Sequence, residues 1–272
     1  MKIPASTDRK RYQALEENFV SSFLDELIPG ILHNFANPLN GIMGRSRLLQ
    51  RRLEDTVKKI HLKHQDLSSE MAEDLNKLLK DIDSIALESD RFFDMFRHAA
   101  IKFDALRDHD ISSIDLSQLL DIEMKFADFY LDFKHEISKV LVLEAALPEV
   151  KGILSDYSMA LWSVIRYALK SMRNDAVKEF HASTTYDDTH VYLRFRHSGY
   201  GMTAKQAGLF ADCLQGGSGD VSPDLDEQRH LLNAMLLLKK YGASTQLILE
   251  DRETTLSIGI PYRGHGDVSS AS

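Results

Sequence analysis

The chain has 272 residues, of which 43% are hydrophobic and 27% charged, an ordinary globular balance with enough length for two domains. Its net charge of −8 argues against a general nucleic-acid or anionic-membrane surface, and its single cysteine, Cys213, excludes an intramolecular disulfide. The sequence has no run of about 18 apolar residues and no apolar leader, so we expect a cytoplasmic protein without a membrane span.

Two stretches in the first part of the chain have apolar residues at alternating steps of three and four, the spacing of bundled helices. They cover residues 28–53 and 71–103, and a short polar segment, 61–69, joins them as an antiparallel hairpin. A single hairpin cannot enclose a core, because each helix buries only one stripe. We therefore expect residues 1–110 to pair with a second chain as a dimeric four-helix bundle.

Residues 111–262 mix helical and strand patterns and are predicted to form an α/β sandwich. A strand entry and a helix start are expected at 114–120, with strands at 134–143, 190–196, 244–250 and 254–260 and helices at 156–172 and 229–241. Asp156 is the predicted N-cap of its helix, and Gly242 is the predicted stop of the last one. The small polar tail, 263–272, is expected to be disordered.

The first predicted helix carries an unusual polar face next to Pro38, a proline in its interior. On that face lie His33, Asn37, Asn40, Gly41 and Gly44. Glycine in a helix interior costs about 1 kcal/mol relative to alanine, so two glycines on one face indicate that a partner approaches the backbone closely. A neutral imidazole is a nucleophile near neutral pH, and an exposed one with room for a partner suits phosphoryl transfer.

The segment HNFANPLNGIMGRSRLL, residues 33–49, resembles the phosphoacceptor box of sensor histidine kinases. The resemblance extends over residues 20–262 and implies a dimerisation and phosphotransfer hairpin followed by an ATP-binding domain. It implies that His33 accepts the phosphoryl group and that Asn37 orients a phosphate oxygen or a water. It also implies that a response regulator docks on the surrounding face, formed by Asn34, Asn40, Gly41 and Gly44.

Several positions depart from the pattern of that family. Asn34 replaces the acidic residue that usually follows the histidine, and an amide cannot act as a general base. Ser171 stands where the family has a magnesium-binding asparagine, with Tyr167 one turn earlier. In HSGYGM, Gly199 and Gly201 match the first glycine box, but His197 replaces its aspartate. Residues 228–232, where a second glycine box is expected, contain no glycine.

The retained and altered motifs together predict a two-component signalling protein without ATP-dependent kinase activity of its own. At His33 it would exchange a phosphoryl group with the aspartate of a response regulator receiver domain, or remove that group. We expect no resident cofactor or metal, because the regulator would supply magnesium. The expected partners are the receiver domain, a second copy of this chain and an upstream kinase, and neither nucleic acid nor membrane. Two alternatives stay open: an active kinase with an atypical ATP site, and a catalytically dead dimeric adaptor.

Overall fold

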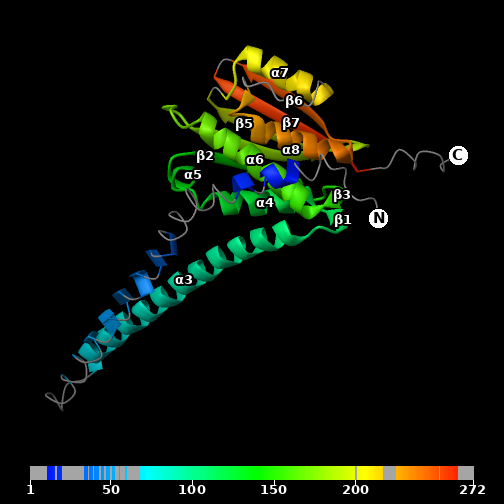
Figure 1. Ribbon diagram of the computed structural model, residues 1–272. Coiled ribbons are helices and arrows are strands. Elements are labelled where there is room, and N and C mark those ends of the chain that lie inside the picture. The colour runs from blue at the N-terminus through cyan, green and yellow to red at the C-terminus, as the bar shows by residue number, and fades with distance from the viewer. Residues whose placement is uncertain are drawn as a thin grey trace. The chain divides into compact units, whose positions relative to one another are not determined.

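The computed structural model divides the chain into two compact units (Figure 1). Residues 28–100 form a helical unit, and residues 1–27 and 101–272 form a second unit, so the division falls ten residues before the predicted boundary at 110. The structure describes residues 11–15, 17–19, 34–35, 37–38, 40–42, 44–45, 47–49, 51–52, 55, 59, 68–199, 201–216, 225–250 and 252–262.

The helical unit is built from two helical stretches. The described residues between 34 and 59 are all helical, and α3 (Ser68–Arg107) contains the whole predicted 71–103 pattern. Contacts between the two stretches run in antiparallel order. The ring of Phe35 lies 5.4 Å from that of Phe92, and Arg52 donates a hydrogen bond to the Lys77 carbonyl at 3.2 Å. The dimeric four-helix bundle stays a prediction.

The second unit is a mixed α/β fold around a five-stranded sheet of order β2-β4-β5-β7-β6, with a separate antiparallel pair, β1-β3. Among the described strands, only β2 and β4 pair in parallel, and the other neighbouring strands are antiparallel. The strands are β1 (Ile111–Ile114), β2 (Ser138–Val142), β3 (Val150–Ile153), β4 (Glu179–Tyr186), β5 (His190–Ser198), β6 (Ser244–Glu250) and β7 (Glu253–Pro261). The helices are α4 (Leu116–Ala127), α5 (Leu131–His135), α6 (Leu154–Ser171), α7 (Ala204–Gln215) and α8 (Arg229–Leu238), followed by a 3-10 turn at Lys239–Tyr241.

The core of the second unit lies between the sheet and helix α6, which packs against α4 and α8 (Figure 1). Strand β5 shows why: Val191, Leu193 and Phe195 alternate with more exposed residues, so one face of the sheet is apolar. Helix α6 is buried along most of its length and carries Trp162, which is 1% exposed. None of the helices among the described residues has the length and apolar character needed to cross a bilayer.

The predicted cap at Asp156 is wrong, because α6 begins two residues earlier at Leu154. The N-cap residue is Ile153, which has no capping side chain, and Asp156 lies inside the first turn. Its carboxylate instead accepts a hydrogen bond from the Tyr241 hydroxyl and pairs with Lys240. The predicted stop at Gly242 is confirmed, since this residue ends the 3-10 turn with a left-handed φ of 77°.

Residues 11–15 and 17–19 are helical and pack against other parts of the second unit. The Tyr12 hydroxyl donates to the Leu106 carbonyl at 3.3 Å, and Leu15 and Phe19 are 1% and 5% exposed. The Phe19 ring lies 5.8 Å from Trp162 in an edge-to-face arrangement. The sequence patterns predicted this segment as part of the helical domain 1–110, whereas the structure groups residues 1–27 with the α/β unit.

Replacing Phe19 by leucine is expected to lower the free energy of unfolding by about 1–2 kcal/mol, through lost aromatic contact and incomplete filling of its space. Urea titration followed by Trp162 fluorescence measures it, because Trp162 is the single tryptophan of the chain. Tyr186→Leu is the control, since this aromatic is 47% exposed and the same replacement there removes little buried surface. An equal effect of both variants would contradict the packing role of Phe19.

Candidate functional site

The first helical stretch of the helical unit, whose described residues run from 34 to 59, presents an exposed polar face. Asn37, Asn40 and Gly44 are all exposed, and a Cβ built on Gly44 meets nothing within 4 Å. His33 itself lies outside the described residues. Asn34 is only 4% exposed and does not belong to this face. The structure thus brings three of the predicted docking or catalytic residues onto one accessible helix surface.

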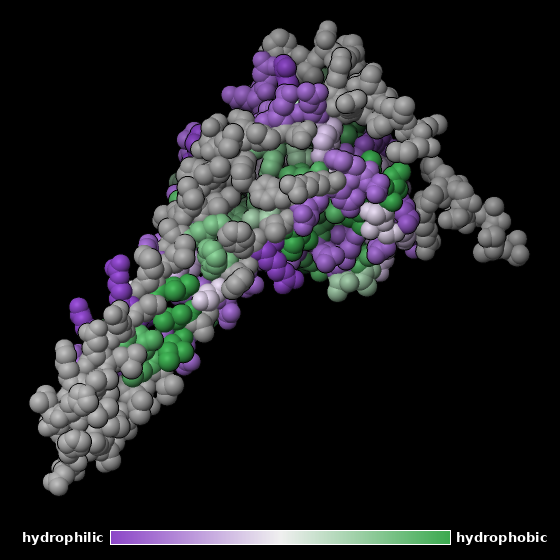
Figure 2. All heavy atoms as spheres, turned by 60° about the horizontal axis from the view of Figure 1, so that its bottom comes forward, coloured by the Kyte–Doolittle hydropathy of each residue, from purple (hydrophilic) through white to green (hydrophobic). Residues whose placement is uncertain are grey.

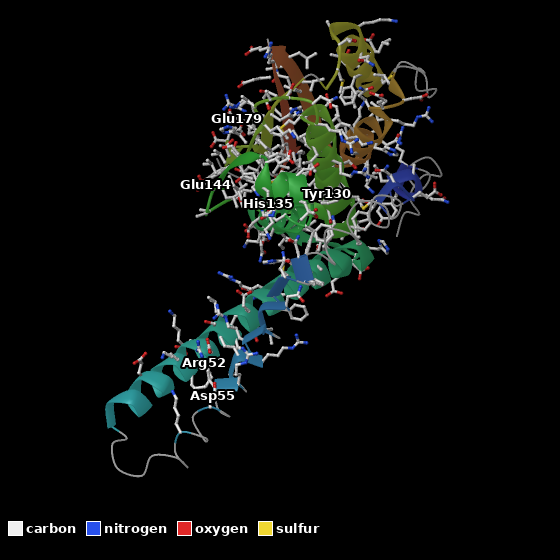
Figure 3. The ribbon with its side chains drawn as sticks, turned by 90° about the vertical axis from the view of Figure 1, so that its left-hand side faces the viewer. Arg52, Asp55, Tyr130, His135, Glu144 and Glu179 are labelled. Atoms are coloured by element: carbon white, nitrogen blue, oxygen red, sulfur yellow. The ribbon has the colours of Figure 1, made fainter. Side chains whose placement is uncertain are left out.

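A buried carboxylate holds this helix against α3. Asp81 is 2% exposed and accepts hydrogen bonds from Arg52 and, at 3.4 Å, from Arg45 (Figure 3 shows Arg52). Gly41 lies on the same contact: a Cβ there would come 3.3 Å from Glu88 Cγ. Gly41 therefore permits close approach of the two helices of one chain. Gly44 faces open space and is the better candidate for contact with a partner protein.

Exposed arginines follow the polar face along the same helix. Arg45, Arg47 and Arg51 are all exposed, within four turns of Asn37. A cluster of guanidinium groups beside an asparagine attracts acidic surfaces and phosphoryl oxygens. The sequence analysis did not single out these residues, although the run GRSRLLQRR displays them.

In the second unit, Gly199 and Gly201 lie in a loop directly against helix α6. Gly199 has a φ of 96°, and a Cβ there would lie 2.4 Å from Asp175 Oδ2 and 2.5 Å from the Ser171 carbonyl. A Cβ on Gly201 would lie 1.9 Å from the Tyr167 hydroxyl. Only glycine fits either position, because the loop backbone touches α6 itself.

Tyr167 occupies the space between α6 and this loop. It is 8% exposed, its ring meets the His197 ring edge-on at 5.6 Å, and burial raises the pKa of its hydroxyl. The Ser171 hydroxyl donates to the Tyr167 carbonyl at 2.8 Å. The four residues predicted for a degenerate nucleotide site, Ser171, His197, Gly199 and Gly201, therefore do come together, but around a tyrosine.

These residues do not fit a magnesium–nucleotide site. Magnesium prefers carboxylate or carbonyl oxygens, and the hydroxyl of Ser171 is already engaged with its own helix. His197 Nδ1 lies 2.8 Å from the Ser198 carbonyl, so this nitrogen carries the proton and points to the backbone. Among the described residues, no group of three or more His, Cys, Asp or Glu side chains is arranged to hold a metal ion.

No family model matches the chain, and no curated protein matches it either. Among solved structures, the catalytic domain of histidine kinase ThkA is similar over 56% of this chain and 96% of its own, at 12% identity and a TM-score of 0.46. Acinetobacter baumannii histidine kinase AdeS is similar over 81% of this chain and 96% of its own, at 13% identity and a TM-score of 0.43. A bacterial phosphotransferase is similar over 94% and 98%, at 11% identity and a TM-score of 0.41. All three TM-scores lie below 0.5, so these similarities do not establish an activity for this chain.

The buried histidine of this site predicts a specific pH dependence. Burial lowers the pKa of His197 from 6.5 to about 4, against smaller opposing effects of the Ser198 carbonyl and Asp175. Between these two pH values the unfolded chain binds a proton at this histidine and the folded chain does not. The free energy of unfolding should therefore fall by up to about 3 kcal/mol as the pH drops from 6.5 to 4.

The measurement is urea unfolding of wild type and His197→Gln from pH 4 to 8. In His197→Gln the free energy of unfolding should no longer show the fall that His197 causes between pH 6.5 and 4. The control is His135→Gln, at an exposed histidine on α5 (Figure 3), which should keep it. An unchanged slope in His197→Gln would show that the side chain titrates as it does in the unfolded chain.

Proposed function

We propose that this protein handles a phosphoryl group at His33, exchanging it with the aspartate of a response regulator receiver domain or removing it, without ATP-dependent kinase activity. The observation that carries the proposal is the exposed face of Asn37, Asn40 and Gly44 on the helix of the phosphoacceptor-like box. Its arginines give that face a positive charge that complements an acidic, phosphorylated partner.

The proposed transfer is a single displacement. The unprotonated nitrogen of the His33 imidazole attacks the phosphorus of the aspartyl phosphate, an N–P bond forms and the O–P bond to the aspartate breaks. The aspartate leaves as a carboxylate, a weak base, and the phosphorylated ring loses its remaining acidic proton to water. This direction needs no general base, so Asn34 in place of an acidic residue does not obstruct it. The receiver domain would bring the magnesium ion.

Packing around Tyr167 supports the absence of kinase activity. A nucleotide between α6 and the Gly199–Gly201 loop would have to displace a buried aromatic ring that already touches Gly201 and His197. The rival proposal, a kinase with an atypical ATP site, requires this displacement. The other rival, an inactive adaptor, needs only the docking face.

The proposed homodimer has its own structural support. Ile82 and Leu87 of α3 are 48% and 54% exposed in a single chain, and Figure 2 shows hydrophobic side chains on the surface of the helical unit. Large exposed apolar side chains on a bundle helix are typical of an interface with another helix pair.

The test presents the purified protein with two phosphoryl donors, each against wild type and His33→Ala. One is radiolabelled ATP with magnesium; the other is a panel of receiver domains phosphorylated with labelled acetyl phosphate. We expect acid-labile, base-stable label on wild type from a receiver domain alone, and none on His33→Ala. Label from ATP alone would establish the kinase. Receiver binding without loss of receiver label, equal in both proteins, would establish the adaptor.

A further inference from the structure

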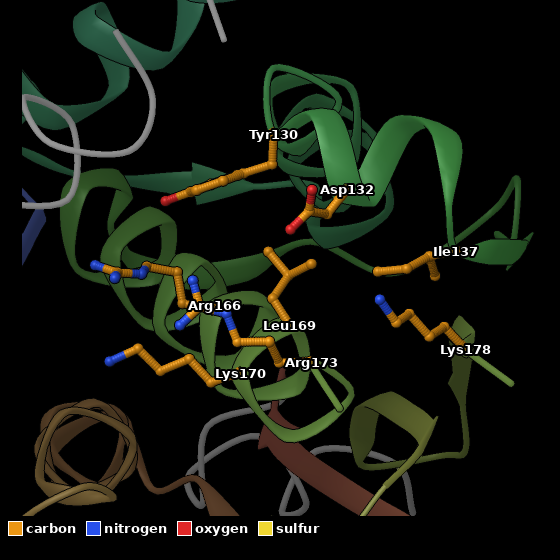
Figure 4. Close-up of a pocket in the computed structure, with 8 residues that line it drawn as sticks. All are labelled: Tyr130, Asp132, Ile137, Arg166, Leu169, Lys170, Arg173 and Lys178. Carbon is orange, nitrogen blue, oxygen red and sulfur yellow. The ribbon is translucent and has the colours of Figure 1, made fainter. Parts of the chain in front are cut away.

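A pocket of the second unit lies between the α4–α5 corner and helix α6. Figure 4 shows this pocket, with Tyr130 and Asp132 on one side and residues of α6 on the other. Leu169 and Ile137 supply its apolar wall, and its volume is about 90 Å³. All of its lining belongs to the second unit.

The charged side chains around the pocket are mostly cationic. Arg166 and Lys170 lie one turn apart on α6, Arg173 lies in the turn just after that helix, and Lys178 comes from the segment before β4. Asp132 is the single acidic residue of the lining, so the formal charge is 4 − 1 = +3. This concentration of positive charge stands out in a chain with a net charge of −8.

Two of these cations have no carboxylate partner among the residues that the structure describes. Lys178 pairs with Glu136, and Arg166 donates to the backbone and side-chain oxygens of Asn18 at 3.4 and 3.3 Å. Among the described residues, no carboxylate lies within ion-pair distance of Lys170 or Arg173. Two cations that line one pocket and have no carboxylate partner in the described part of the chain favour the binding of an external anion.

The charges of two of these cations, Arg166 and Lys170, also act on His230 of α8. Burial lowers the pKa of His230, and the charges of Lys170, Arg166 and Arg229 lower it further. The charges of Arg166 and Lys170 therefore act on a side chain of α8 as well as on the pocket. Tyr167 and Ser171, which also belong to α6, point toward Gly201 and do not line the pocket. The pocket is therefore separate from the site around Gly199 and Gly201.

We propose that this pocket binds a small phosphate-bearing molecule, with Lys170, Arg173 and Lys178 contacting the phosphate oxygens and Leu169 and Ile137 contacting its apolar part. The size of the cavity decides the class of ligand. Pockets for drug-sized ligands usually enclose about 300–1,000 Å³, whereas about 90 Å³ suits one phosphate group and a few attached atoms. The inference does not depend on phosphoryl transfer at His33.

The test is calorimetric titration of the full chain with orthophosphate and with phenyl phosphate at low ionic strength. Both should bind, phenyl phosphate more tightly because of the apolar wall. Lys170→Gln and Arg173→Gln should each weaken binding about 10-fold or more, as expected for a charge-assisted hydrogen bond. Arg194→Gln is the matched control: it removes an equal charge from an exposed position on β5 and should leave binding unchanged.

A second arm separates a soluble phosphate from a lipid headgroup. Vesicles containing phosphatidic acid should not sediment the protein if the ligand is soluble. Sedimentation that is lost in Lys170→Gln but kept in Arg194→Gln would identify the ligand as a headgroup. No binding of either phosphate and no sedimentation, or equal weakening by Arg194→Gln, would overturn the pocket as an anion site.

Discussion

Replacing Lys102 by methionine is expected to lower the free energy of unfolding by about 3–5 kcal/mol, the usual cost of leaving a buried charge without its partner. Lys102 and Glu123 are both fully buried, and the lysine Nζ lies 2.8 Å from each carboxylate oxygen. Ser158 completes the group: its hydroxyl accepts from Lys102 at 2.7 Å and lies 2.6 Å from Glu123.

Aromatic rings surround this ion pair and keep water away. The Lys102 Nζ lies 5.5 Å from the ring centroid of Phe19, 5.9 Å from that of Phe126 and 5.4 Å from that of Trp162. Burial lowers the pKa of the lysine, and Glu123 acts in the opposite direction. Lys102 thereby joins the end of α3 to α4, α6 and the N-terminal residues. Its removal leaves the Glu123 carboxylate in the same apolar enclosure.

Two further variants sharpen this prediction. Lys125→Met makes the same replacement at an exposed pair with Asp121 four residues earlier, and should change the free energy of unfolding by about 0.5 kcal/mol or less. Lys102→Met combined with Glu123→Leu removes both charges and should be more stable than Lys102→Met alone. Urea unfolding at neutral pH measures all three. A Lys102→Met effect as small as that of Lys125→Met would contradict the paired, desolvated state of this lysine.

Patterns with strong local signals were readable from the sequence. The heptad spacing of 71–103 lies inside α3, and the two strands predicted at 244–250 and 254–260 pair as β6 and β7. Each of these elements is specified by its own alternation of apolar residues and by a local stop such as Gly242. Long-range packing is not needed to recognise them.

Strand β4 was missed because its buried face is only partly apolar. Between the buried Phe180 and the end of the strand, the inward residues are Ala182 and Thr184, which give little alternation of hydrophobicity. Thr184 is accepted in the core because its hydroxyl pairs with Ser117 at 2.7 Å and accepts from the Glu144 amide at 2.9 Å. Those partners come from distant segments of the chain, so the sequence of residues 179–186 alone does not indicate a buried strand.

Helix α7 was not predicted, although the sequence at its N-terminus contains a recognisable capping motif. Thr203 and Gln206 form a capping box, in which the Gln206 amide donates to the Thr203 hydroxyl at 3.2 Å and the Thr203 amide donates to the Gln206 side chain at 2.9 Å. The predicted strand at 134–143 begins only at Ser138, because α5 takes the residues before it. The position of Tyr167 against Gly201 depends on tertiary packing and has no sequence signature.

Replacing Asn37 by alanine is expected to separate phosphoryl transfer from phosphatase activity. If Asn37 orients a water on the phosphate of a docked receiver domain, Asn37→Ala should slow release of inorganic phosphate about 100-fold, as removal of one positioned hydrogen-bonding group usually does. His33→Ala should leave that release in place, because water is the nucleophile. If His33 itself accepts the phosphoryl group, His33→Ala should instead abolish the loss of label from the receiver domain.

The measurement follows labelled phosphate on a receiver domain over time, with free phosphate and labelled protein counted separately. Asn174→Ala is the matched control, since it removes an exposed amide in the second unit, away from the helix of the box. Asn37 is exposed, so its truncation should leave the free energy of unfolding nearly unchanged. A loss of activity in this variant would therefore come from the chemical step or from docking of the receiver domain. Receiver affinity, measured in parallel, distinguishes those two. Wild-type rates in both Asn37→Ala and His33→Ala would contradict any chemical role of this face and leave only an adaptor, because neither the nucleophile nor the amide would then contribute to the fate of the phosphoryl group.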